Sequence, residues 1–131
     1  MGLIYLDSCI CIYAVERSSV HHEEVSNALA SQPASQLAIS NMVMAECLVG
    51  PLRIGDSFLL RDFENFFKLA ANLDLNEAVY RQAAQIRSAS ALKMPDAIHL
   101  ACAQFHGCDE LWTNDGRLDD VSRGLARRVV G

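Results

Sequence analysis

The sequence lacks the features of several protein classes. Of its 131 residues only 7 are glycine and 3 are proline, too few for a fibrous or low-complexity chain. No apolar run approaches the roughly 18 residues that a membrane-spanning helix needs, and no basic stretch of a secretory signal follows Met1. Charged residues make up only 21% and apolar residues 51%, which argues against disorder. We therefore expect one globular domain, residues 1–131, with no membrane association.

The 5 cysteines follow no pattern of a disulfide framework. Their number is odd, no Cys-x-x-Cys pair occurs, and most have apolar neighbours, as in Ala101-Cys102-Ala103. Cys9 and Cys11 together with His21 and His22 offer zinc ligands, but their spacing fits no standard structural site. We interpret the cysteines as reduced core thiols of a cytoplasmic protein.

Excess negative charge is confined to the first half of the chain. The net charge is −5, since residues 1–66 contain 3 basic and 8 acidic groups and residues 67–131 contain 8 of each. An acidic total disfavours non-specific binding of nucleic acid. It does not exclude a nucleic-acid enzyme whose carboxylates hold a metal ion. A group of arginines near the C-terminus is available for phosphate contacts: Arg117, Arg123, Arg127 and Arg128.

Short apolar runs alternate with helical patterns along the chain. The predicted strands cover residues 3–6, 37–40, 73–75, 110–113 and 128–130. The predicted helices cover about 8–16, 20–31, 41–49, 56–72, 76–91 and 95–107, and Gly50-Pro51 is expected to end the third of them. This alternation predicts an α/β domain with a parallel sheet, whose ligand site lies beyond the carboxyl ends of its strands. The loops after Leu6, Ser40 and Thr113 are therefore candidates for the site.

Four acidic residues stand at positions where apolar residues are expected. Asp7 follows the first apolar run, Glu46 lies within an apolar helix, Asp96 opens another, and Asp115 follows the strand at 110–113. Removing an isolated carboxylate from water costs several kcal/mol or neutralises the group. Carboxylates gathered at one point repel each other, a divalent cation removes that repulsion, and oxygen ligands favour Mg²⁺ or Mn²⁺. The pattern predicts metal-assisted hydrolysis of a phosphodiester.

Each of these acids also has a simpler interpretation. Asp7 and Asp96 can serve helix N-termini, Glu46 can face solvent, and Asp115-Gly116 can form a turn. Only their combined placement favours a metal site.

Several polar neighbours are candidates for supporting roles. We interpret His99 as a buried histidine beside the site rather than a metal ligand or catalytic group. Ser8 and Thr113 can orient carboxylates or water through their hydroxyl groups, although a local cap is equally compatible with their positions. His21 and His22 are predicted to be exposed.

At these residues the sequence resembles the PIN-domain family and, within it, the VapC-type toxin ribonucleases. Four segments carry the resemblance: Leu6-Asp7-Ser8 with Ile12-Tyr13, Ala45-Glu46 with Gly50-Pro51-Leu52, Met94-Pro95-Asp96-Ala97-Ile98-His99-Leu100-Ala101, and Trp112-Thr113-Asn114-Asp115. The third segment is the most specific, and the order and spacing agree over nearly the whole chain. One departure is Cys9, where the family usually has asparagine.

The resemblance implies an αβα sandwich with a parallel sheet of four or five strands and an acidic pocket at the strand ends. It also implies Mg²⁺- or Mn²⁺-dependent cleavage of RNA and a cognate antitoxin that blocks the site. The implied catalytic and metal-binding residues are Asp7, Glu46, Asp96 and Asp115. The predicted supporting or substrate-binding residues are Ser8, Thr113, Asn114 and Arg117, and Asp119 and Asp120 are alternatives for the fourth acid.

Other functions are compatible with parts of the sequence. A PIN-like module without catalysis, acting only in protein binding, is one alternative. Another α/β phosphoester hydrolase is a second, but an aspartate-nucleophile phosphatase would have aspartate in place of Cys9. A dinucleotide enzyme would have a glycine-rich turn after Leu6. A phosphate-receiver domain would have a lysine late in the chain, whereas Lys93, the last lysine, precedes Asp96.

Four of the 5 phenylalanines lie within ten positions: Phe58, Phe63, Phe66 and Phe67. We expect Phe58 and Phe67 to lie off the helix face that carries Phe63 and Phe66. Part of this cluster is then predicted to be covered by a second copy in a homodimer or by an antitoxin.

Overall fold

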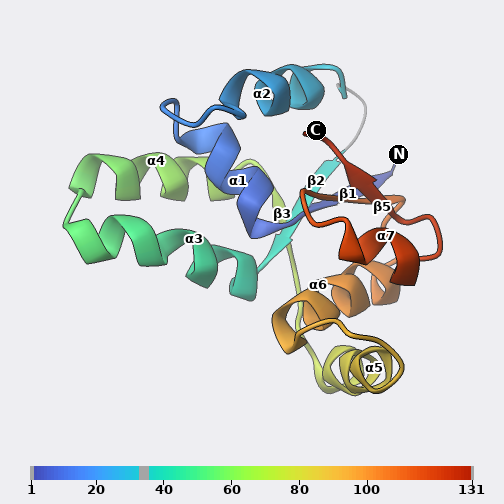
Figure 1. The fold of residues 1–131 in the computed structure, drawn as a ribbon. Coiled ribbons are helices and arrows are strands. Elements are labelled where there is room, and N and C mark those ends of the chain that lie inside the picture. Colours follow the sequence, from blue (N-terminus) through green and yellow to red (C-terminus); the bar gives the residue numbers. More distant parts are fainter. Residues whose placement is uncertain (1, 33–35, 131) are drawn as a thin grey trace.

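The computed structural model describes residues 2–32 and 36–130, and its centre is a five-stranded parallel sheet (Figure 1). The strand order is β3-β2-β1-β4-β5, and every pair of neighbours is parallel. The strands are β1 (Leu3–Leu6), β2 (Gln36–Ser40), β3 (Ala71–Leu73), β4 (Glu110–Thr113) and β5 (Ala126–Arg128). The prediction of an α/β fold with a parallel sheet is confirmed.

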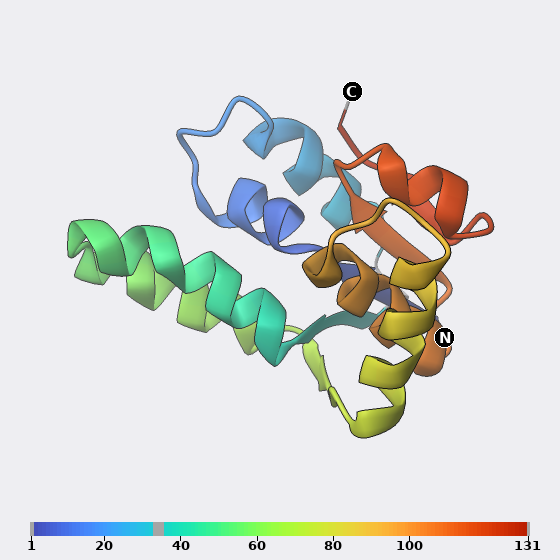
Figure 2. The same cartoon turned by 60° about the horizontal axis from the view of Figure 1, so that its bottom comes forward.

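Helices cover both faces of the sheet. They are α1 (Ser8–Val15), α2 (His22–Ala30), α3 (Asn41–Ile54), α4 (Ser57–Phe67), α5 (Glu77–Ser88), α6 (Met94–Phe105) and α7 (Arg117–Val121). Helices α1 to α4 lie on one side and α5 and α6 on the other (Figures 1 and 2). This division follows from right-handed crossovers, because the chain steps outward from β1 to β3 and then returns past β1 to β4. Helices α3 and α4 form a hairpin that reaches away from the sheet (Figure 2).

The centre of the core is the β1–β4 pair with the helix that packs on it. Tyr5 and Leu6 of β1 and Trp112 of β4 have no exposed surface, and the residues of α6 from Ala97 to Ala103 are all buried. This packing fixes the carboxyl ends of β1 and β4 beside each other, with Leu6 paired to Trp112. Among the described residues, no helix is both long and apolar enough to cross a membrane.

The predicted end of α3 was wrong. The helix passes through Gly50-Pro51 and ends at Gly55, whose φ of +69° is the left-handed conformation that glycine adopts without strain. The N–H of Gly55 donates to the carbonyl of Leu52, and the N–H of Asp56 donates to that of Pro51. Pro51 is buried within the helix, where its missing N–H leaves one backbone hydrogen bond unmade.

The two edge strands lie two residues earlier than predicted, because their register follows their neighbours. Leu73 pairs with Ser40 and Arg128 with Thr113, so β3 ends at 73 and β5 at 128. Apolar Leu75 and Val130 pack on the core beyond the strands without joining the sheet. The short helix α7 was not predicted.

The prediction that Phe67 lies off the helix face of Phe63 was wrong. Phe63 and Phe67 are four positions apart, so they share a face of α4, and both are buried with ring centroids 6.1 Å apart. Phe66 is partly buried, whereas Phe58 is 75% exposed.

Candidate active site

The four acidic residues singled out from the sequence line one pocket. Its volume is about 360 Å³, and its walls are Asp7, Ser8, Cys9, Glu46, Asp96, Asn114 and Asp115. Asp7 follows β1, Asp115 follows β4, Glu46 lies on α3, and Asp96 lies in the first turn of α6. The pocket therefore opens at the carboxyl edge of the two central strands, where parallel sheets bind their ligands.

Asp7 is the most buried of the four acids and is surrounded by donors. It is only 7% exposed, and it caps α1 by accepting the N–H of Ser8 on Oδ1 at 2.7 Å. The hydroxyl of Thr113 donates to its other oxygen, Oδ2, at 2.9 Å. Asp7 is thus both a helix cap and a wall of the pocket. The two donors stabilise its carboxylate in a site from which most water is excluded.

Asp115 is linked to Asp7 through Thr113 and is paired with Arg117. The N–H of Asp115 donates to the Thr113 hydroxyl oxygen at 3.1 Å. The guanidinium of Arg117 donates to both carboxylate oxygens of Asp115, from Nε at 3.1 Å and from Nη2 at 3.0 Å. These hydrogen bonds hold the pKa of Asp115 below its ordinary value. Asp119 and Asp120 lie exposed on α7 and do not line the pocket.

Glu46 contacts His99, a pairing for which the sequence holds no local signal. His99 is 1% exposed, and its Nε2 lies 2.7 Å from Oε1 of Glu46 and 3.8 Å from Oδ1 of Asp7. Burial raises the pKa of Glu46, but the hydrogen bond with His99 and the charge of that ring bring it below 4.5. Burial lowers the pKa of His99, but the hydrogen bond with Glu46 and the charges of Asp7 and Glu46 bring it above 6.5.

Asp96 carries the least compensated negative charge of the four acids. Its pKa is raised above 3.8, first by burial and then by the negative charges of Asp7 and Asp115. Both the loss of water and the like charges nearby disfavour the ionised form of this carboxyl group. A bound cation would reverse this effect.

The donor set of the pocket fits a divalent cation. Within the described part of the chain, Asp7, Glu46 and His99 offer ligand atoms that all lie within 4.8 Å of one another. The carboxylate oxygens of this set, with Asp96 and Asp115 on the same pocket wall, match the preference of Mg²⁺ and Mn²⁺ for oxygen ligands.

The remaining predicted residues lie in or beside the pocket. Ser8 and Asn114 line it, and the Asn114 amide donates to the Tyr13 hydroxyl at 3.1 Å. Arg117 is exposed and contacts Asp115.

The prediction that His21 and His22 are exposed was wrong, since both are half-buried. The ring of His21 packs edge-on against Tyr13 with centroids 4.8 Å apart. Nδ1 of His22 lies 2.8 Å from the Tyr13 carbonyl oxygen, because the connection from α1 folds back to begin α2.

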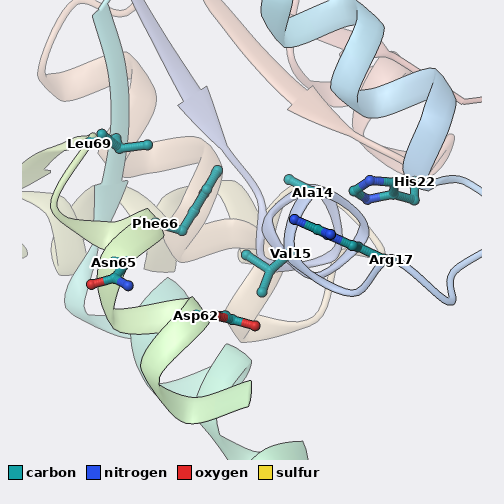
Figure 3. A pocket seen from close by; sticks show the side chains of 8 residues that line it. All are labelled: Ala14, Val15, Arg17, His22, Asp62, Asn65, Phe66 and Leu69. Carbon is teal, nitrogen blue, oxygen red and sulfur yellow. The ribbon is translucent and has the colours of Figure 1, made fainter. Parts of the chain in front are cut away.

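A second, larger pocket of about 680 Å³ lies between α1, α2 and α4 (Figure 3). None of the four acids lines it. Its walls are Ala14, Val15, Arg17, His22, Asp62, Asn65, Phe66 and Leu69. Its walls mix apolar side chains with single charges of both signs, so the acidic pocket is the candidate active site.

The family model of the PIN domain matches residues 4–124. This chain belongs to the PIN-domain family. No curated protein sequence matches it. Membership extends over nearly the whole chain, so the acidic pocket lies within the PIN domain.

Solved structures share the fold of this PIN domain. A toxin–antitoxin complex from Klebsiella pneumoniae superposes with a TM-score of 0.80 at 23% identity, covering 97% of this chain and 98% of that chain. VapBC2 from Rickettsia felis, bound to a DNA fragment from its promoter, gives 0.81 at 17% identity, covering 95% and 97%. Mycobacterium tuberculosis VapC20, a sarcin–ricin loop cleaving toxin, gives 0.78 at 16% identity, covering 93% and 95%. These likenesses concern the fold.

Proposed function

We propose that this PIN domain is a metal-dependent endoribonuclease of the VapC type, a toxin that hydrolyses RNA phosphodiesters. The observation that carries the proposal is the convergence of Asp7, Glu46, Asp96 and Asp115, which come from separate parts of the chain, on one pocket. The burial of Asp96 beside the negative charges of Asp7 and Asp115 supports a cation as its partner. The fold shared with a sarcin–ricin loop cleaving toxin supports RNA as the substrate.

In this proposal the four carboxylates hold Mg²⁺ or Mn²⁺. When bound, such an ion lowers the pKa of water and offsets negative charge on a phosphoryl oxygen. The protein's own groups prepare the pocket for the substrate. Thr113 and Ser8 hold the Asp7 carboxylate in one orientation. The Thr113 hydroxyl oxygen also accepts a hydrogen bond from the backbone N–H of Asp115.

Arg117 is the candidate for phosphate binding. Its guanidinium pairs with Asp115 at the pocket and remains exposed, so it can also face an incoming phosphate. A planar guanidinium matches phosphate oxygens in a two-point geometry. The positive charge also offsets the charge that develops on the phosphate during hydrolysis.

An antitoxin partner is the second part of the proposal. The α3–α4 hairpin exposes large apolar side chains, which we call the apolar ridge: Val49, Leu52, Ile54 and Phe58, exposed by 48%, 63%, 72% and 75%. Apolar patches of this kind mark protein interfaces. Toxin–antitoxin complexes among the structures of the same fold support an antitoxin as the partner that covers the apolar ridge. A second copy of the protein, in a homodimer, is the alternative partner. With its unpaired thiols, the protein is proposed to act in the cytoplasm.

The deciding experiment is RNA cleavage by the purified protein with Mg²⁺, Mn²⁺ or EDTA. We expect cleavage with either ion and none with EDTA. Asp96→Asn should abolish cleavage and leave the fold intact by circular dichroism. Asp119→Asn is the matched control, because Asp119 is exposed beside the site and does not line the pocket.

Undiminished cleavage by Asp96→Asn, or in EDTA, would contradict the proposed mechanism. Absence of cleavage by the wild type under all three conditions would favour the non-catalytic binding module.

A further inference from the structure

A chain of buried polar groups runs from the acidic pocket into the sheet beneath it. Beyond the 2.7 Å contact between Glu46 and Nε2 of His99, Nδ1 of the same ring lies 2.7 Å from the Tyr5 hydroxyl. That hydroxyl lies 2.8 Å from Oγ of Ser40. Tyr5, Ser40 and His99 are at most 1% exposed, so these groups satisfy their hydrogen bonds with one another.

The donors and acceptors in this series of hydrogen bonds can be assigned for a neutral His99. Oγ of Ser40 accepts the N–H of Val43 at 3.4 Å, which leaves the Ser40 hydroxyl hydrogen free to donate to the Tyr5 oxygen. The Tyr5 hydroxyl then donates to Nδ1 of His99. Nε2 carries the proton and donates to Glu46, because an ionised carboxylate can only accept.

In a charged His99 both ring nitrogens carry a proton. The Tyr5 and Ser40 hydroxyl groups then only have to reverse the direction of their hydrogen bonds. Nδ1–H then donates to the Tyr5 oxygen, and the Tyr5 hydroxyl donates to Ser40. Nε2 keeps its proton and its hydrogen bond to Glu46 in both states. The opposite neutral form, with the proton on Nδ1 alone, would place the Nε2 lone pair against the Glu46 carboxylate at 2.7 Å.

The residues of this hydrogen-bonded series belong to the central strand and to packed helices. Tyr5 lies on the central strand, paired with Ala38 on one side and Leu111 on the other. Ser40 is the N-cap of α3, the helix that carries Glu46, and His99 lies on the buried face of α6. The ring is therefore held on both nitrogens by groups from the sheet and from α3.

We propose that His99 is a positioning residue for the cation site: Tyr5 and Ser40 keep its Nε2–H directed at Glu46, which holds that carboxylate beside Asp7. Its role is to orient a ligand rather than to bind the ion, although its Nε2 lies close enough to both carboxylates to be considered a ligand. The inference rests on the proposed cation site, but neither of its tests needs RNA.

The first test is NMR of the full chain labelled with ¹⁵N-histidine, before and after addition of Mg²⁺. We expect the His99 Nε2 resonance to be that of a protonated nitrogen in both samples. In Tyr5→Phe, which removes one hydroxyl group, the Nδ1 resonance should move to that of a nitrogen without a hydrogen-bond donor. A neutral ring that is protonated on Nδ1 alone in the wild type, or loss of the Nε2 proton on adding Mg²⁺, would overturn the proposal.

The second test is the affinity for Mn²⁺ by calorimetry, without RNA. Loss of an outer hydrogen-bond partner of a metal ligand weakens metal binding by about 10–100-fold. We expect that loss in His99→Leu and a smaller one in His99→Gln, whose amide can still donate to Glu46. His106→Leu is the control, because His106 is a half-buried histidine at the far end of α6 that does not line the acidic pocket; its ring packs against Phe105, and its Nε2 lies 2.8 Å from the Asp74 carbonyl oxygen.

Wild-type affinity in a folded His99→Leu would overturn the positioning role. If that variant does not fold, Tyr5→Phe provides the same comparison, with an unchanged Mn²⁺ affinity as the contrary result. Failure of the wild type to cleave RNA would count against the proposed function and leave both of these measurements valid.

Discussion

The hydroxyl of Thr113 donates to Oδ2 of Asp7 at 2.9 Å, which joins two residues 106 positions apart at the ends of β4 and β1. The same hydroxyl oxygen accepts the N–H of Asp115 at 3.1 Å. One side chain with no exposed surface therefore contacts the carboxylate of Asp7 and the backbone of Asp115.

We predict that Thr113→Val reduces both stability and activity. Valine keeps the shape of threonine but leaves a buried carboxylate oxygen without its donor, which costs about 1–3 kcal/mol. The free energy of unfolding, measured with urea, should fall by that amount, and kcat/KM for RNA cleavage should fall about tenfold or more. Thr113→Ser keeps the hydroxyl and should retain most of both. Equal loss in the serine variant would show that the methyl group, not the hydrogen bond, matters.

We predict that Asp96→Asn stabilises the metal-free protein. Because the pKa of Asp96 is raised in the folded state, the wild type loses stability as the pH rises from 3.8 through that raised pKa. Asparagine removes this loss, so its advantage should be present at neutral pH and absent in acid. Urea unfolding in EDTA at several pH values measures it. A variant less stable than the wild type at pH 7 would contradict the crowding of charge.

We predict that Mg²⁺ stabilises the wild type and has little effect on Asp96→Asn. An ion that binds only the folded state adds about 2.7 kcal/mol at 100 times its Kd. Thermal unfolding with and without Mg²⁺ measures the shift in Tm. Asp119→Asn should behave as the wild type does, and an equal shift in Asp96→Asn would remove Asp96 from the cation site.

We predict that the thiols react slowly in the folded protein. Burial raises the pKa of Cys9 and of Cys102 to about 12, and that of Cys108 to about 11, so little thiolate exists at pH 8. Mass spectrometry after brief iodoacetamide treatment should find these residues unmodified. The same treatment in guanidinium should modify all 5 cysteines. Rapid modification of native Cys9 would contradict its packing.

We predict that a double variant of the apolar ridge, Ile54→Ser with Phe58→Ser, abolishes association and leaves cleavage unchanged. Both side chains are mostly exposed and neither lines the acidic pocket. Light scattering of the protein alone tests a second copy, and co-purification with the product of the adjacent reading frame tests an antitoxin. Tyr80→Ser, at an exposed aromatic of α5, is the control. A wild-type protein that is monomeric at micromolar concentration and does not bind the product of the adjacent reading frame would contradict the proposal that a partner covers the apolar ridge.

The local features of the chain determined much of this protein. The segments 3–6 and 110–113 form β1 and β4 with the predicted bounds, because buried parallel strands are rich in apolar residues. Asp7 and Asp115 follow those strands directly, and Pro95 places Asp96 in the first turn of α6. Since parallel strands end at one edge, Asp7 and Asp115 could be expected to meet.

Only the tertiary structure decided the rest. The contact of Glu46 with His99 joins residues 53 positions apart, and the hydroxyl groups that support it come from β1 and from the start of α3. The end of α3 at Gly55 and the bounds of β3 and β5 likewise follow from packing and register. Hydrophobic period and capping residues are local properties of a sequence. The orientation of a buried side chain depends on partners that only the folded sheet and helices bring within hydrogen-bonding distance.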